Sequence, residues 1–320
     1  MKTIVIFLFA ALSPCAVQSQ SPAPLFDMHS SMWVNLHHFL YITGRARAGL
    51  DANRTTVTAS LGDTAGFGRL SAAQRAAWES AVTYYQRTVS PKDILFDSAT
   101  VAINDRLVEL DTAASLARSG LDPGLISALE TAAPVYRTLW WARHDGGNQA
   151  WMDNVKPVLA KYGPGAAQRV THILRSTWHP VRVDVVAYAN WAGAYTTEHP
   201  SHIMISNAID STGAAGQFEM LFHEVQHTMS DSLFIGLRDA FRAANKPLPR
   251  DPTHPFIFYT AGDITHRLFP GYVPFAERVW LWTRNPDWAK LRPLLDASWQ
   301  LYLDGSISWS EALQRIAARA

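Results

Sequence analysis

Residues 217–227 read QFEMLFHEVQH, and this stretch carries the most specific motif in the chain. At 100° per residue on a helix, five apolar side chains in and just after this stretch fall within about 100° of one another and predict one buried stripe; they are Phe218, Leu221, Phe222, Val225 and Met229. His223 and His227 fall on the opposite side, one turn apart, where two imidazoles can hold one metal ion. Glu224 lies beside this polar side, where a general base can reach a water on the ion. The stretch therefore predicts an internal helix that presents a metal site to a cleft.

Short β-type segments precede this helix, starting after Pro180. Residues 181–188 are β-branched and partly alternating, which predicts a strand. Residues 191–197 and 202–206 predict a second and a third strand, and we expect the three to form a small β-meander. His202 opens the third segment and is expected to be an ordinary surface residue.

The other segments have helical patterns. Ser71 and Gln74 form a capping box for a helix that runs to about residue 90. The chain after the proline-rich loop is helical, and further helices are expected near 28–41, 98–119, 123–143, 148–161 and 165–176. The predicted fold class is α+β and mostly helical. It has a helical N-terminal subdomain over 20–176 and a metal-binding subdomain with the β-meander over 177–320.

The first 19 residues have the pattern of a signal peptide. Lys2 gives a basic start, residues 3–12 are apolar, and small residues allow cleavage after Ser19. Cys15 follows a proline, which fits a lipoprotein box poorly. We therefore expect an exported, periplasmic or extracellular protein. Its mature chain would lack cysteine, which excludes disulfides and thiolate metal ligands.

The composition narrows the possible partners. The chain has 28 basic and 27 acidic side chains, and this balance argues against nucleic acid or an anionic membrane surface as a partner. Hydrophobic residues make up 48% of the chain, enough for a packed core. No later stretch reaches 18 apolar residues, so no membrane span is expected. The sequence has no nucleophile elbow and no P-loop, and neither serine-hydrolase nor nucleotide chemistry is supported.

The motif His223-Glu224-x-x-His227 resembles that of the zincin metallopeptidases. The resemblance covers about residues 181–270. It implies a hydrolase that cuts peptide bonds, with one Zn²⁺ per chain, His223 and His227 as zinc ligands, and Glu224 as the base that activates a zinc-bound water. In that superfamily the motif helix packs beside a small sheet whose edge strand lines the cleft. A peptide or protein substrate would then lie extended along residues 202–206.

A catalytic zinc site needs a third protein ligand. The metzincin extension is absent after His227, and the chain is more similar to the gluzincin branch, in which a carboxylate on a later helix completes the site. Asp263 is the expected ligand, with His266 as the alternative. Tyr259, Asp263, His266 and Arg267 share one helix face. Tyr259 or His266 would then hydrogen-bond to the developing oxyanion. The plainer alternative is that Asp263 and His266 pair with Arg267.

A second hypothesis is a di-iron carboxylate oxidoreductase. Glu224 and His227 form a Glu-x-x-His pair, and Asp263 and His266 form its shorter analogue. In this hypothesis His223 has no role, and the strands fit a helical bundle poorly. One bound zinc would favour the hydrolase, whereas two irons would favour the oxidoreductase.

A third hypothesis is a non-catalytic binding module that keeps a zinc-site scaffold. The intact Glu224 argues against it, because a module without activity is free to lose the base. Three further histidines, His29, His37 and His38, cluster near the N-terminus. They would line the cleft, hold a second metal, or serve as ordinary core or surface residues.

Overall fold

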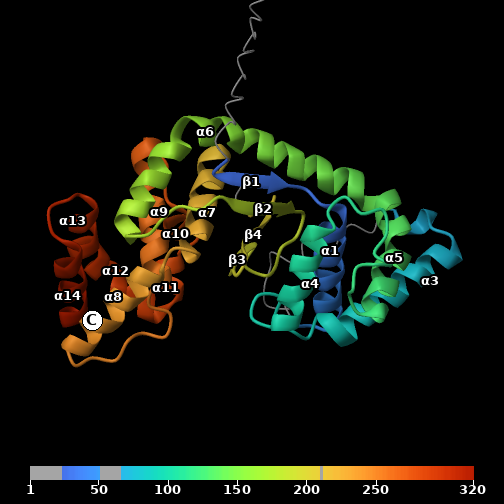
Figure 1. The fold of residues 1–320 in the computed structure, drawn as a ribbon, viewed down its shortest axis with the longest axis horizontal. Coiled ribbons are helices and arrows are strands. Elements are labelled where there is room, and N and C mark those ends of the chain that lie inside the picture. Colours follow the sequence, from blue (N-terminus) through green and yellow to red (C-terminus); the bar gives the residue numbers. More distant parts are fainter. Residues whose placement is uncertain (1–23, 51–65, 210–211) are drawn as a thin grey trace, which may run out of the picture.

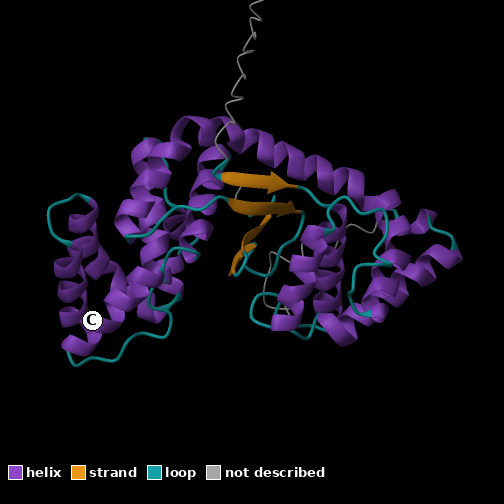
Figure 2. Cartoon of the chain, in the orientation of Figure 1, coloured by secondary structure: helices purple, strands orange, loops and turns teal. Residues whose placement is uncertain are grey.

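The computed structural model describes residues 24–50, 66–209 and 212–320 (Figure 1). The predicted signal peptide, with Cys15, lies outside these residues. The fold is α+β and mostly helical, as expected, with one small sheet (Figure 2). Within the described ranges, no helix combines the length and the apolar character needed to cross a membrane.

The sheet has four strands, in the order β1-β2-β4-β3. They are β1 (Phe26–His29), β2 (Val181–Val186), β3 (Ala194–Glu198) and β4 (Ser201–Ser206). Strands β1, β2 and β4 run parallel, and β3 is antiparallel to β4.

This order corrects the expected meander in two respects. Strand β4 lies between β2 and β3, so β3 is the edge strand and residues 202–206 are internal. Strand β4 is buried on both faces, whereas β3 ends in polar side chains, which suits an edge. Residues 26–29 form a strand that was not predicted, although residues 28 and 29 were expected to start a helix, and this strand joins the sheet from the N-terminal part of the chain.

Helices from the first half of the chain form a bundle that we call the N-lobe. Its elements are α1 (Met32–Arg47), η2 (Phe67–Arg69), α3 (Ala72–Tyr84), η3 (Tyr85–Val89), α4 (Ser98–Glu109), α5 (Pro123–Tyr136) and η4 (Arg137–Trp141). The predicted capping box is present at the start of α3, since the side chains of Ser71 and Gln74 each accept a bond from the other's backbone N–H. Helix α1 packs against η3, α3, α4 and α5.

The long helix α6 (Ala142–Leu174) runs from the N-lobe across to the second helical group (Figure 1). Two separate helices were expected here, but Pro157 and Pro164 are both accommodated inside one helix.

We call the second group the C-lobe. It contains α7 (Ala214–His227), α8 (Asp231–Ala243), α9 (His254–Leu268), α10 (Phe275–Arg278), α11 (Leu281–Arg284), α12 (Pro286–Leu294), η5 (Leu295–Trp299), α13 (Gln300–Leu303) and α14 (Trp309–Arg319).

The sheet lies between two hydrophobic cores. Val183, Ile203 and Ile205 belong to the C-lobe core, and Tyr195 and Met204 belong to the N-lobe core. Because neighbouring strand residues point to opposite faces, β2, β3 and β4 each contribute to both cores, whereas β1 contributes only to the C-lobe core. The sheet therefore fixes β3 between the two lobes.

Candidate metal centre

Helix α7 has the buried stripe that its sequence predicts. Phe218, Leu221, Phe222 and Val225 are at most 1% exposed. The helix packs against α6, α9 and β3. Its opposite side carries the motif residues, so the sequence places them at the boundary between the core and a cleft.

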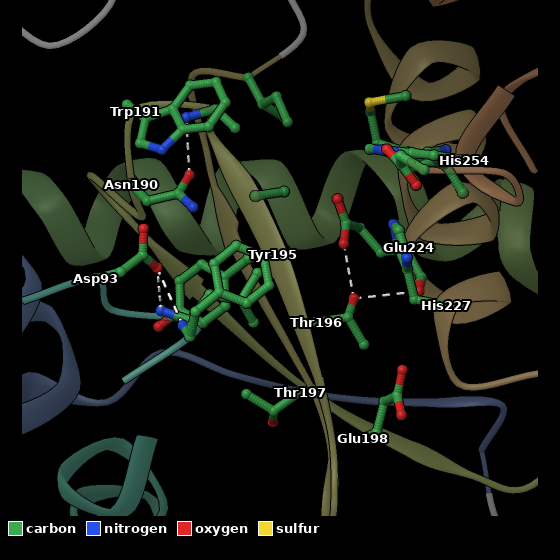
Figure 3. Close-up of a pocket in the computed structure, with 18 of the residues that line it drawn as sticks. Asp93, Asn190, Trp191, Tyr195, Thr196, Thr197, Glu198, Glu224, His227 and His254 are labelled. Carbon is green, nitrogen blue, oxygen red and sulfur yellow. Dashed lines mark hydrogen bonds and ion pairs between the residues drawn. The ribbon is translucent and has the colours of Figure 1, made fainter. Parts of the chain in front are cut away.

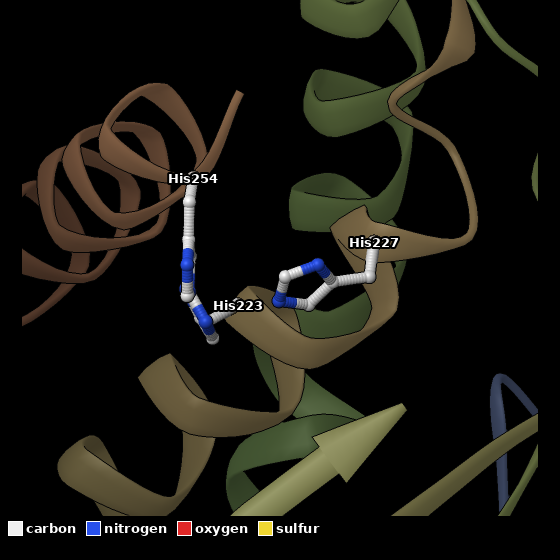
Figure 4. Close-up of side chains that lie close together, drawn as sticks. All are labelled: His223, His227 and His254. Carbon is white, nitrogen blue, oxygen red and sulfur yellow. The ribbon is translucent and has the colours of Figure 1, made fainter. Parts of the chain in front are cut away.

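Three imidazoles meet on this side of α7. His223 and His227 come from the motif, and His254 is the first residue of α9 (Figure 4). One ring nitrogen from each residue can be chosen so that all three lie within 4.8 Å of one another. Among the described residues, the buried Nδ1 of His223 has no hydrogen-bond partner. Three converging imidazoles with an orphaned nitrogen fit a divalent transition metal.

The local electrostatics favour the neutral forms of His223 and His227. Burial, and then the neighbouring His227 and His254, lower the pKa of His223 well below its usual value. Burial and His254 lower the pKa of His227 to about 3. A metal ligand must be a neutral imidazole. His223 and His227 are therefore already in the form that binds an ion at neutral pH.

Asp251 orients the third ring. Its Oδ2 lies 3.0 Å from Nδ1 of His254. The carboxylate accepts the Nδ1 proton, which leaves the Nε2 lone pair of His254 for a metal. The His254 interaction also lowers the pKa of Asp251, against the effect of burial, and so keeps this carboxylate charged.

Glu224 is held beside the three rings by the edge strand. The Thr196 hydroxyl on β3 lies 2.7 Å from Glu224 Oε2 and 3.1 Å from the Glu224 backbone carbonyl (Figure 3). Burial raises the pKa of the Glu224 carboxyl to about 7, and the Thr196 hydrogen bond opposes this shift. No hydrogen bond from a described residue reaches the second carboxylate oxygen, which is left to exchange a proton.

A cleft of about 640 Å³ opens over this group. One wall is β3, and α7 and α9 form the other. Phe258 of α9 stacks on His223 with ring centroids 3.7 Å apart. The volume is in the range of clefts that bind small ligands or short peptide segments.

A buried carboxylate that the sequence analysis did not single out fixes the cleft wall. Glu219 lies one turn before His223 and accepts hydrogen bonds from the Tyr272 hydroxyl, at 2.6 Å, and from the Phe275 backbone N–H, at 2.9 Å. Phe275 lines the cleft. Glu219 thereby joins the motif helix to the segment that carries this ring.

The structure does not bring Asp263 to the histidine pair. Asp263 lies nine residues after His254, which places it about 180° away on α9. Both its oxygens accept bonds from Arg267 Nε, at 2.8 and 2.9 Å. The acid–arginine pair, given above as the plainer alternative, is thus present, and His254 occupies the place expected of Asp263.

Tyr259 and His266 also lie away from the three rings. The Tyr259 hydroxyl is within hydrogen-bond distance of Asp296 and Gln300, and His266 Nδ1 donates to the Tyr272 carbonyl. Both residues line a separate cavity with Asp263. Neither contacts Glu224, and the second metal-binding pair of the di-iron hypothesis is not gathered with the first.

His254 is the site residue that the sequence analysis missed. The available signal was the spacing Asp251-x-x-His254, an acid one turn before a histidine at the start of a helix. It was obscured because these residues stand in a proline-rich loop that gave no reason to expect a ligand.

The other histidines that the sequence analysis named have structural partners. His37 and His38 lie in the N-lobe core, bonded to the hydroxyls of Tyr85 and Tyr195. His29 lies between Asp27 and Asp111. His202, expected at the surface, is instead 5% exposed and bonded to Asp184, because β4 is an internal strand.

Comparisons with known proteins give no family for this chain: no family model, no curated protein and no solved structure matches it.

Proposed function

We propose that this protein is a zinc-dependent hydrolase that cuts peptide bonds. The observation that carries the proposal is the convergence of His223, His227 and His254 beside Glu224 in one cleft. Three histidines with an open side are a ligand set of catalytic zinc. Bound there, zinc would supply a Lewis acid that polarises a carbonyl and acidifies water.

Glu224 would act as the general base. The Thr196 hydroxyl holds one oxygen of the carboxylate, and the second oxygen is left to take a proton from the attacking water. The same oxygen would then pass the proton to the leaving amine. A pKa raised by burial places Glu224 closer to the pH at which both transfers are efficient.

The free edge of β3 supports a peptide substrate. Gly193 accepts a bond from the N–H of Ser206 in β4, so the alternation of an antiparallel ladder pairs Tyr195 and Thr197 with β4 as well. The backbone groups of Ala194, Thr196 and Glu198 then face outward. An extended peptide would pair with these groups on β3, and not with residues 202–206.

Metal analysis and one substitution test the proposal. We expect one zinc per chain, and we expect Glu224→Gln to keep the zinc and to lose at least a hundredfold in turnover of a peptide library. Glu109→Gln, a change of the same type at an exposed position on α4, is the control. Two bound irons would favour the oxidoreductase. A zinc-loaded parent that cleaves no peptide would favour the non-catalytic binding module.

Export is proposed on the pattern of residues 1–19 alone. N-terminal sequencing of protein recovered outside the cytoplasm is expected to begin near Gln20. Recovery of exported protein that still carries Lys2 would contradict the predicted cleavage.

A further inference from the structure

The charge of the cleft differs from that of the whole chain. The chain is nearly neutral, but none of the described residues that line the cleft is lysine or arginine. Four lining residues carry carboxylates, and they are Asp93, Glu198, Glu224 and Asp251. The cleft is therefore acidic before any metal is bound.

Three of these carboxylates already have partners. Asp93 accepts the backbone N–H groups of its own turn, at 2.9 and 3.1 Å. Glu224 is held by Thr196, and Asp251 by His254. Glu198 differs, because its carboxylate has no hydrogen bond or ion pair with a described residue.

Glu198 also has a defined place relative to Glu224. It lies two residues after Thr196 on β3, and residues two apart on a strand point to the same side, about 7 Å apart. Thr196 contacts Glu224 on that side. Figure 3 shows the Glu198 carboxylate projecting from the strand below Thr196, toward the same wall. The side chain is exposed, so a ligand can reach it.

We infer that Glu198 selects peptides with a cationic side chain two residues from the scissile bond, an inference that rests on the proposed function. A peptide paired with the free edge of β3 places the residue opposite Thr196 beside Glu224. The residue opposite Glu198 then lies two positions further along, with its side chain on the same face, where directly opposed Cβ atoms are about 5 Å apart. A lysine or arginine there meets an unpaired carboxylate in a cleft whose described lining contains no lysine or arginine of its own.

Binding to the Glu224→Gln variant tests this inference without cleavage. Acetylated, amidated ten-residue peptides carry a single Lys, Gln or Glu that is moved along an otherwise uncharged sequence, and affinities are measured by calorimetry. At one position we expect Lys to bind about fivefold more tightly than Glu. The double variant with Glu198→Gln is expected to lose this preference, and the one with Glu198→Lys to reverse it. Glu109→Gln in the same background is expected to keep it.

An unchanged Lys-to-Glu ratio after Glu198→Gln overturns the inference, and so does a failure of every peptide in the series to bind. A peptide with a free N-terminus and no lysine shows whether an α-amine serves as the cation instead of a side chain, which would also overturn it. Cleavage by the parent without any charge preference defeats only the role of Glu198. A charge preference in binding without any cleavage by the zinc-loaded parent defeats the proposed function and leaves the role of Glu198 standing.

Discussion

His38 in the N-lobe and His254 in the C-lobe have the same tautomer but opposite surroundings. In each ring Nδ1 faces an acceptor, the Val34 carbonyl for His38 and the Asp251 carboxylate for His254. Each Nε2 therefore carries a lone pair. In the N-lobe this lone pair accepts the Tyr195 hydroxyl proton at 2.8 Å, whereas in the C-lobe it faces two more imidazoles.

The same contrast extends to the neighbouring histidines. His37 and His144 each have a ring nitrogen bonded to a tyrosine hydroxyl, from Tyr85 and Tyr136. His223 Nδ1 has no such partner among the described residues. Burial alone thus does not distinguish a structural histidine from a metal ligand. His37 Nε2 is also buried without a partner, so an unpaired nitrogen alone does not distinguish them either. Among the described residues, His223 differs because ring nitrogens of His227 and His254 lie within 4.8 Å of one of its own.

The largest expected effect is on metal content. His254→Ala removes one of the three proposed ligands and is expected to reduce zinc from one per chain to nearly none, because two protein ligands rarely hold zinc tightly. Asp263→Ala and His144→Gln are expected to keep the zinc. Elemental analysis after dialysis measures all three. Zinc retained by His254→Ala and lost from Asp263→Ala would mean that Asp263 is the third ligand, as expected from the sequence, and that His254 is not.

Acidification tests the role of the histidines that are bonded to tyrosine hydroxyls, because it changes the free energy of unfolding. Burial lowers the pKa of His38 to about 4, and burial followed by the Arg143 charge lowers that of His144 to about 4. Unfolded histidines titrate near 6.5, so below that pH the unfolded chain binds protons that the folded chain does not. The free energy of unfolding should fall from pH 6.5 to pH 4, by up to about 3 kcal/mol per residue.

Urea unfolding of metal-free protein at pH 7 and at pH 4.5 measures this loss. His38→Gln removes one titrating ring and should lose less stability between the two pH values than the parent. His144→Gln serves the same purpose if the first variant does not fold. If parent and variant lost the same free energy of unfolding, protonation of the substituted histidine would not destabilise the N-lobe.

Asp251→Asn tests whether the Asp251 carboxylate, which accepts the Nδ1 proton of His254, contributes to zinc affinity. The amide keeps the size of the side chain but loses the charge that holds the Nδ1 proton, so zinc affinity is expected to fall by about ten- to a hundredfold. Competition with a chelator of known affinity measures the change. Asp239→Asn on the exposed face of α8 is the control. Equal zinc affinities for the parent and Asp251→Asn would mean that packing alone orients His254.

The smallest expected effect is on peptide turnover. It concerns strand β3, which contacts both the N-lobe histidine His38 and the candidate metal centre. Tyr195 bonds to His38, and the next residue, Thr196, bonds to Glu224. Thr196→Val keeps the shape but removes this hydrogen bond, and we expect peptide turnover to fall about tenfold, with zinc content unchanged. Thr197→Val, on the other face of the strand, should have little effect. Steady-state kinetics on one peptide compares the two, and equal rates would exclude a role for the Thr196 hydroxyl.

Local patterns in the sequence predicted the elements that depend on neighbouring residues. The buried stripe of α7 and the capping box of α3 are both confirmed, because each depends on residues at most a few turns apart. The position of the motif histidines opposite the stripe follows from the same periodicity. Segments 191–197 and 202–206 were also correctly placed as strands, within a few residues of their ends.

Features that depend on long-range pairing were not predictable in this way. Nothing near residues 26–29 indicates that they pair with Val181 and its neighbours, so no strand was predicted here and residues 28 and 29 were assigned to a helix. The identity of the edge strand depends on which of β3 and β4 pairs with β2. The third imidazole depends on which face of α9 meets α7, and the polar face that drew attention, with Asp263 and Arg267, is the other one.

The pairing of β1 with β2 also affects the order in which the protein can assemble. Strand β1 precedes the whole N-lobe bundle, but its partner β2 follows that bundle, and β4 must then be inserted before β3 can become an edge. During synthesis the N-lobe helices can collapse early, while β1 cannot pair until β2, which ends at Val186, has left the ribosome. The sheet is thus a late, high-contact-order step, and the cleft wall forms only after the first half of the chain has already folded around it.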